Sequence, residues 1–328
     1  MIGWAGLVAV AAAAPFFLKE IELFTATRIV ILALWATSLN LLLGQTGLVS
    51  FAHAAYFGAG AYTSALLWLH LDWSPLIGVP LSIPVAAVIA FVTGAFALRA
   101  ARLYFSLLTL ALSQLLFVGV FQWYSFTRGD NGIHGIEVPE FLFSIANSYW
   151  LVLAIAVVGL IGLRLIATSP FGAALLAIRE NRQRAAFIGI NVKRYELAVF
   201  TIAGGFAGLA GALFAISNQE AFPNLLFWTA NATPIFVILI GGMFRFGGPL
   251  IGALVLVVLE ETVTRETLYS NLVLGSILLV IVLVAPAGIE GIAERLLARV
   301  RDRRSRRDTE TPGGTSPRTP EKKMEAQA

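Results

Sequence analysis

The chain has 328 residues, of which 58% are hydrophobic and only 13% are charged, well below the ~25% charged fraction of soluble domains. This composition excludes an ordinary soluble protein, and it excludes disorder, a collagen-like repeat or nucleic-acid binding as descriptions of the whole chain. Without cysteine there is no disulfide framework, thiolate nucleophile or iron–sulfur cluster, and His53, His70 and His134 lack metal-ligand spacing. The remaining class is a polytopic membrane protein.

A transmembrane helix needs ~20 mostly apolar residues, and residues 1–288 have room for about ten such segments. The predicted spans are Gly3–Leu18, Phe24–Leu43, Ala52–Leu71, Leu76–Leu98, Leu103–Trp123, Tyr149–Ile166, Tyr195–Ser217, Trp228–Met243, Gly247–Val263 and Leu268–Ala285. Glycine and proline around Gly44–Ser50 and Gly241–Pro249 predict broken or re-entrant helices. The fold class is therefore an all-α polytopic membrane protein with 8–10 transmembrane helices.

The distribution of basic residues predicts the orientation. The even ten-span arrangement places 19 of the 23 Lys and Arg residues on one side, which the positive-inside rule makes the cytoplasmic side. Both termini then lie in the cytoplasm. Residues 289–328 carry 10 basic and 7 acidic residues and are rich in Arg, Pro, Thr and Gly, so they predict a disordered basic cytoplasmic tail beyond a 1–288 transmembrane domain.

The stretch from Ser38 to Tyr62 places many polar and small residues at membrane depth. Polar side chains are costly there unless they face protein or a wet cavity. The cluster is interpreted as helix–helix packing or as part of a translocation pathway, and a neutral His53 that bonds a neighbouring helix is the favoured role for the histidine. The candidate pathway residues are Asn40, Gln45, Thr46, Ser50, His53 and Tyr56.

Two loops are long enough to carry function. The outer loop, residues 124–148, contains TRGDNGIHGIEVPE, in which glycines punctuate polar residues as in a tight irregular loop. The inner loop, residues 167–194, has apolar residues at Leu175, Ile178, Ala185 and Ile188 with charged residues between them. This spacing predicts a short amphipathic helix outside the membrane, ended by Gly189 and Asn191.

Catalytic chemistry is not indicated. No Ser/His/Asp constellation, paired catalytic carboxylates or HExxH motif occurs, and the phosphate-binding pattern GxxxxGK[ST] is absent. The chain is therefore expected not to be an enzyme, to hold no metal or cofactor, and not to hydrolyse ATP by itself in the P-loop manner.

Five stretches, in order between about Ile29 and Ala287, resemble the LivM-type permeases of bacterial ABC importers for branched-chain amino acids. They are LNLLLGQTGLVSFAHAAYFGAGAYTSALL, GDNGIHGI, SPFGAALLAIRENRQRAAFIGINVKRYELAVFTIAGGFAGLAGALFA, ILIGGMFRFGGPLIGALV and VLVAPAGIEGI. The resemblance implies the ABC importer permease fold in a bacterial inner membrane. It also implies a second, related permease, two cytoplasmic ATPases that use ATP, and a periplasmic substrate-binding protein as partners.

The resemblance also assigns roles to the two loops. It implies a coupling helix that docks on the ATPase over Ala177–Asn191, with the alternative that its arginines only anchor it at the lipid surface. The outer-loop residues would contact the binding protein or form a capped turn over the pathway. The coupling residues are Arg179, Glu180, Arg182, Arg184, Ala185 and Gly189, and the outer residues are Arg128, Asp130, Asn131 and His134.

The expected function is import of branched-chain amino acids through half of a pathway that partner ATPases drive. Relatives on the same scaffold also move other amino acids and small amides such as urea, so a permease for another small polar solute is an alternative. An ion-coupled secondary transporter is the other alternative, but such proteins usually need intramembrane ionisable residues, and the central spans offer few.

Overall fold

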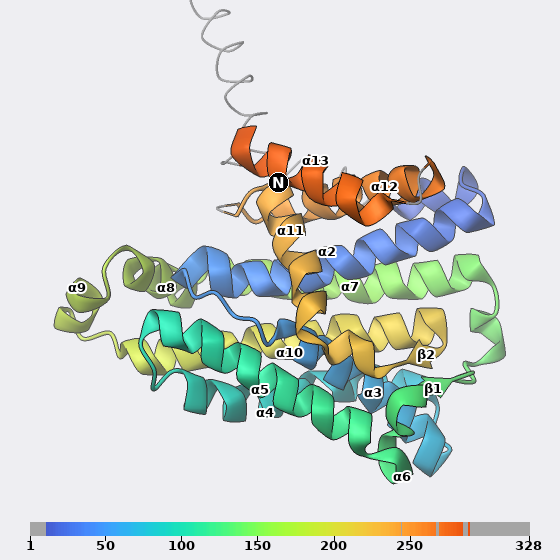
Figure 1. Cartoon of the computed structure of the whole chain (residues 1–328), viewed down its shortest axis with the longest axis horizontal. Coiled ribbons are helices and arrows are strands. Elements are labelled where there is room, and N and C mark those ends of the chain that lie inside the picture. The colour runs from blue at the N-terminus through green and yellow to red at the C-terminus, as the bar shows by residue number, and fades with distance from the viewer. Residues whose placement is uncertain (1–10, 244, 267–268, 285–287, 289–328) are drawn as a thin grey trace, which may run out of the picture.

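The computed structural model describes residues 11–243, 245–266, 269–284 and 288, and the predicted tail at 289–328 lies outside these residues. The described chain is almost entirely helical (Figure 1). Its longer helices are α2 (Glu20–Thr46), α3 (His53–Leu71), α4 (Pro75–Ala97), α5 (Arg102–Gln122), α7 (Ile145–Thr168), α8 (Pro170–Glu180), α10 (Val192–Asn218), α11 (Ala232–Gly241), α12 (Gly248–Glu266) and α13 (Ser270–Val284).

Shorter elements fill the connections. They are the helices α6 (Tyr124–Thr127) and α9 (Arg182–Phe187), the 3₁₀ turns η1 (Ala14–Phe16), η2 (Gly129–Asn131), η3 (Glu140–Leu142), η4 (Pro223–Leu226) and η5 (Trp228–Asn231), and the strands β1 (Ile133–His134) and β2 (Glu220–Ala221). The strands pair antiparallel, with Ile133 opposite Ala221 and His134 opposite Glu220.

The predicted segments from the second onward are confirmed as helices. Each of the nine predicted segments from Phe24 to Ala285 corresponds to a helix, with ends that differ by a few residues. Five of these helices, α2, α4, α5, α7 and α10, are long and apolar enough to cross a membrane on their own within the described residues. The others are shorter or more polar, in keeping with broken spans. Of the predicted first span, only residues 11–18 are described.

The centre of the bundle is α10, which packs against α2, α3 and α4. Glycines let these helices approach to backbone contact, as small residues do in membrane proteins. A Cβ added at Gly60 on α3 would lie 1.9 Å from the carbonyl oxygen of Gly208 on α10, and one at Gly211 would lie 1.7 Å from the carbonyl oxygen of Phe57. The α3–α10 contact therefore has no room for even one methyl group.

The two predicted loops lie at opposite ends of the bundle. Figure 1 shows α8 and α9 at one end, and α6 with the β1–β2 pair at the other. The first end carries Arg179, Arg182, Arg184, Lys193 and Arg194. The orientation predicted from the positive-inside rule would place this end in the cytoplasm, and it stays a prediction.

Both predicted helix breaks are present. The first begins at Gly47, where the backbone turns left-handed at φ 70° after α2 has ended at Thr46. The second follows Gly241 at the end of α11, where Gly242 adopts φ 123° before α12 starts at Gly248. Glycine is suited to both positions because it has no Cβ to clash at positive φ.

The close approach of α3 and α10 gives a prediction for stability. Replacing Gly60 with alanine forces a methyl group into the backbone of Gly208, and overpacking of this kind typically costs about 1–3 kcal/mol. We expect a lower midpoint of thermal unfolding for the purified protein in detergent. The matched control is Gly119→Ala on α5, where nothing lies within 4 Å of the added Cβ. An equal loss of stability in both variants would contradict the packing argument.

Candidate functional site

The site is built around the non-helical segment 47–52, which joins α2 to α3. A helix satisfies its own backbone groups in a bilayer, whereas a non-helical segment is tolerated only where it is buried in protein or lines a wet cavity. Nearby side chains provide hydrogen-bond partners for two backbone amides of this segment. Thr46 Oγ1 accepts a hydrogen bond from the amide of Leu48 at 3.3 Å, and Ser50 Oγ accepts one from the amide of Ala52 at 3.2 Å.

Helix α5 supplies two further partners for the segment. Ser106 Oγ donates to the carbonyl oxygen of Val49 at 2.7 Å, and Thr109 Oγ1 accepts from the amide of Phe51 at 3.1 Å. Thr109 is fully buried. Two hydroxyl groups on one helix face therefore hold the middle of the segment from the side of α5.

The fully buried Asn231, at the end of η5, completes the arrangement. Its Oδ1 accepts from the amide of Ala54 at 2.7 Å, and its Nδ2 donates to the carbonyl oxygen of Phe51. Ala54 lies in the first turn of α3, where the amides have no partner within the helix. One side chain thus caps α3 from a distant part of the sequence and fixes the end of segment 47–52.

Two of the predicted pathway residues, Asn40 and Gln45, lie in the C-terminal half of α2. Asn40 is buried, and its Nδ2 donates to the carbonyl oxygen of Arg245 at 3.2 Å, in the turn between α11 and α12. Gln45 is partly buried one residue before Thr46. Asn40 thus joins α2 to the second helix break.

The other four predicted pathway residues, Thr46, Ser50, His53 and Tyr56, are all buried. The hydroxyl groups of Tyr56 and Thr93 on α4 are 2.6 Å apart, and the ring of His53 meets that of Tyr56 edge-on at 5.7 Å. Within the described residues neither ring nitrogen of His53 has a hydrogen-bond partner, so the expected bond to a neighbouring helix is not found.

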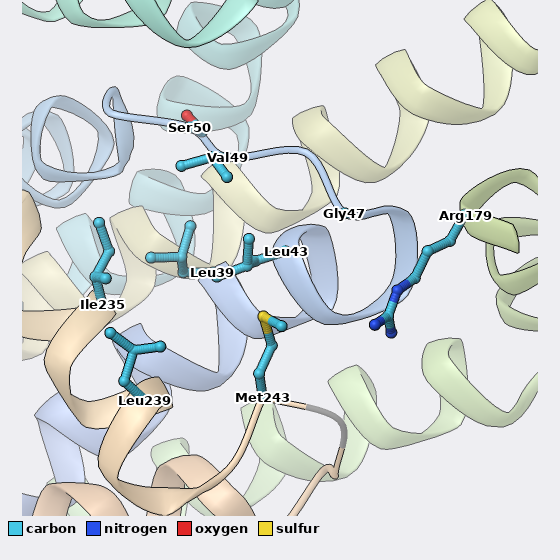
Figure 2. A pocket seen from close by; sticks show the side chains of 9 residues that line it. All are labelled: Leu39, Leu43, Gly47, Val49, Ser50, Arg179, Ile235, Leu239 and Met243. Atoms are coloured by element: carbon cyan, nitrogen blue, oxygen red, sulfur yellow. The ribbon is translucent and has the colours of Figure 1, made fainter. Parts of the chain in front are cut away.

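A cavity of about 350 Å³ lies beside segment 47–52 (Figure 2). Helix α2, the segment itself and α11 form its walls. Met243, which lies just after the end of α11, and Arg179 of α8 complete the lining. The lining residues are Leu39, Leu43, Gly47, Val49, Ser50, Arg179, Ile235, Leu239 and Met243. Of the six predicted pathway residues, Ser50 lines this cavity, and the pathway role of all six stays a prediction.

The inner loop forms two helices, whereas the sequence predicts one. Ser169 caps α8 by accepting from the amide of Gly172, and Asn181 then leaves the helical conformation and caps α9 by accepting from the amide of Arg184 at 2.9 Å. Asparagine is among the preferred N-cap residues because its side-chain oxygen bonds a first-turn amide. The loop therefore bends sharply at Asn181 between α8 and α9.

Two of the predicted coupling residues point inward. The Arg179 guanidinium donates to the carbonyl oxygen of Gly44 in the last turn of α2, where a positive charge complements the helix dipole. Arg182 pairs with the fully buried Glu196 of α10, with Nη2 and Oε2 2.6 Å apart. These two arginines bond the inner loop to α2 and α10.

The outward face of the loop is different in character. Glu180, Arg184 and Gly189 are exposed, whereas Ala185, in the middle of α9, is buried. At the end of α9, Phe187 and Ile188 have 89% and 74% of their surface exposed. We call this apolar pair the α9 tip. The sequence prediction of coupling residues does not include it, although both residues lie between the predicted coupling residues Ala185 and Gly189.

The four predicted outer-loop residues, Arg128, Asp130, Asn131 and His134, are all exposed at the opposite end. His134 lies 3.5 Å from Glu220 on the paired strand and contacts the carbonyl oxygen of Asn131 at 2.7 Å. The Asp130 carboxylate hydrogen-bonds the Tyr124 hydroxyl and thereby raises the pKa of Tyr124 above its ordinary value. These four polar side chains are therefore exposed on the loop, and their contact with a binding protein stays a prediction.

The chain matches the family model for "Branched-chain amino acid transport system / permease component" over residues 22–285. The high-affinity branched-chain amino acid transport system permease proteins LivM of Salmonella typhimurium and Escherichia coli K12 are each 26% identical to it, over 86% of this chain and 73% of theirs. The probable branched-chain amino acid transport permease protein LivH of Methanocaldococcus jannaschii is 26% identical over 82% of this chain and 91% of its own. No solved structure matches the chain.

The two bonds of Asn231 give a prediction. Replacing Asn231 with leucine removes the partners of the Ala54 amide and the Phe51 carbonyl, and each unsatisfied buried group costs about 1–3 kcal/mol. We expect a clear drop in the thermal midpoint of the detergent-purified protein.

The control for this change is Asn224→Leu. Asn224 is exposed on η4, and within the described residues no hydrogen bond of its side chain is found, so its replacement should leave the midpoint close to that of the wild type. If the two variants melt together, Asn231 is not what holds segment 47–52.

Proposed function

The chain belongs to the family of branched-chain amino acid transport permease components, and on this premise we propose that it is one permease subunit of an ABC importer for leucine, isoleucine and valine. It would form half of the pathway beside a second, related permease, which agrees with matches to relatives named both LivM and LivH. The observation that carries the proposal is the family match over 22–285, which spans the broken-helix site and both loops.

The proposal places the energy source outside this chain. Two ATPases would bind and hydrolyse ATP at the cytoplasmic end, and a periplasmic binding protein would deliver the amino acid at the β1–β2 end. The basic residues around α8 and α9 support this orientation in a bacterial inner membrane, with both termini in the cytoplasm. The exposed α9 tip is suited to a groove on an ATPase, because large apolar side chains are otherwise costly to expose to water.

The arginine contacts suggest how ATPase movement would reach the membrane. A displacement of α9 carries α8 with it, and α8 is bonded through Arg179 to the end of α2 at Gly44. Segment 47–52 begins three residues further on and forms one wall of the cavity. Movement at the cytoplasmic surface thus reaches the break between α2 and α3 through one hydrogen bond and part of one helical turn.

Reconstitution tests the proposed function. Proteoliposomes that contain the chain with its partner permease and ATPases should accumulate radiolabelled leucine when ATP and the binding protein are supplied, because the ATPases drive import. Accumulation should stop with a non-hydrolysable ATP analogue, and a proton or sodium gradient should not replace ATP. Uptake that persists without ATP and follows either gradient would instead identify a secondary transporter.

Two variants separate docking from transmission. Phe187→Asp should reduce the amount of ATPase that co-purifies with the permease, because it places a charge on the apolar α9 tip. Arg179→Gln should leave co-purification intact and lower the leucine imported per ATP hydrolysed, because it weakens the bond to Gly44. Loss of the ATPase from the Arg179→Gln complex would make Arg179 a docking residue and would contradict its assignment as the link.

A further inference from the structure

The cavity beside segment 47–52 is lined almost entirely by apolar side chains, with one charged group. Most of its surface comes from two leucines of α2, from an isoleucine and a leucine of α11, and from Met243. The Arg179 guanidinium lies at the end nearest the cytoplasmic loop, as Figure 2 shows. An apolar wall with a fixed positive charge at one end matches an amino acid that has an apolar side chain and a carboxylate.

We propose that this cavity is a transit site for the substrate, which holds the apolar side chain of the amino acid between α2 and α11 and places its carboxylate toward Arg179. This inference rests on the proposed function and deepens it, because it names the part of the permease that senses the substrate side chain.

The size of the cavity fits a single amino acid. Small-molecule sites in proteins usually measure about 300–1,000 Å³, and a cavity of about 350 Å³ lies at the lower end of that range. Leu239 and Met243 on one wall face Leu39 and Leu43 on the other (Figure 2). A change in the volume of one of these side chains should therefore alter which substrates fit.

The backbone of segment 47–52 argues that water, and not lipid, reaches this cavity. Val49 and Ser50 both line it, and within the described residues no hydrogen bond is found for either of their amides. An amide that faces lipid hydrocarbon loses several kcal/mol, and non-helical backbone inside a membrane protein is either buried in protein or lines a water-filled cavity. Ser50 is buried, whereas Val49 is 39% exposed, so we expect water to reach Val49.

The absence of cysteine from the chain allows a direct test. In the reconstituted complex, Val49→Cys should react with a membrane-impermeant, charged methanethiosulfonate reagent, and leucine supplied with ATP and binding protein should slow the reaction. The matched control is Val158→Cys, a valine in the middle of α7 that is 70% exposed on the outside of the bundle and does not line the cavity. It should react at least about tenfold more slowly than Val49→Cys, because a charged reagent reaches a lipid-facing thiol only by entering the hydrocarbon, where a charge is costly.

Both alternatives to this result overturn the inference. If Val49→Cys reacts no faster than Val158→Cys, the cavity is filled by lipid or by the partner permease. If it reacts rapidly but leucine gives no protection, the cavity holds water without holding the substrate.

A second variant tests selectivity. Leu239→Phe fills part of the cavity and should lower leucine import about tenfold, the usual effect of one misfit group in an apolar pocket, while valine import falls less. Leu254→Phe is the control, because Leu254 is exposed on α12 away from the cavity. Failure of the wild-type complex to import leucine with ATP would defeat the proposed function. Normal wild-type import with an equal effect of Leu239→Phe on leucine and valine would defeat the transit site alone.

Discussion

The structure depends on how the chain provides hydrogen-bond partners for a non-helical backbone segment in the interior of a helical membrane protein. Every amide and carbonyl of segment 47–52 that is not bonded by protein must meet water or lose several kcal/mol. Hydroxyl groups on α5 and the side-chain amide of Asn231 supply partners from elements far apart in the sequence. These bonds fix where α3 starts and how α5 and η5 lie around it, and they leave part of the segment facing the cavity.

The same segment explains why the inner loop contacts the bundle at the end of α2. Because α2 ends at Thr46, its last carbonyl groups have no partner within the helix. The guanidinium of Arg179 fills this need at Gly44 and adds a positive charge at the negative end of the helix dipole. A continuous transmembrane helix would offer no such acceptor near the loop. The break that creates the cavity therefore also creates the attachment point for α8.

The sequence predicts the spans well, because an apolar run of ~20 residues is a strong local signal. It also marks the polar cluster between Ser38 and Tyr62 as unusual at membrane depth. It does not identify Ser106, Thr109 or Asn231 as partners, because each lies in an apolar or loop segment with nothing local to indicate a distant amide. The sequence does contain a signal for the bend at Asn181, because asparagine is a preferred N-cap residue. The spacing of apolar residues across this position nevertheless favours one continuous helix.

The rigid and adjustable parts of the bundle follow from how the helices touch. Between α3 and α10 the backbones meet at Gly60 and Gly211 without intervening side chains, so no rotamer change can absorb a sliding movement. Around the cavity, α2 faces α11 through leucine, isoleucine and methionine side chains, which can repack. Both helices end there at a glycine with positive φ, Gly47 or Gly242. A displacement applied through Arg179 should therefore change the width of the cavity before it disturbs the α3–α10 contact.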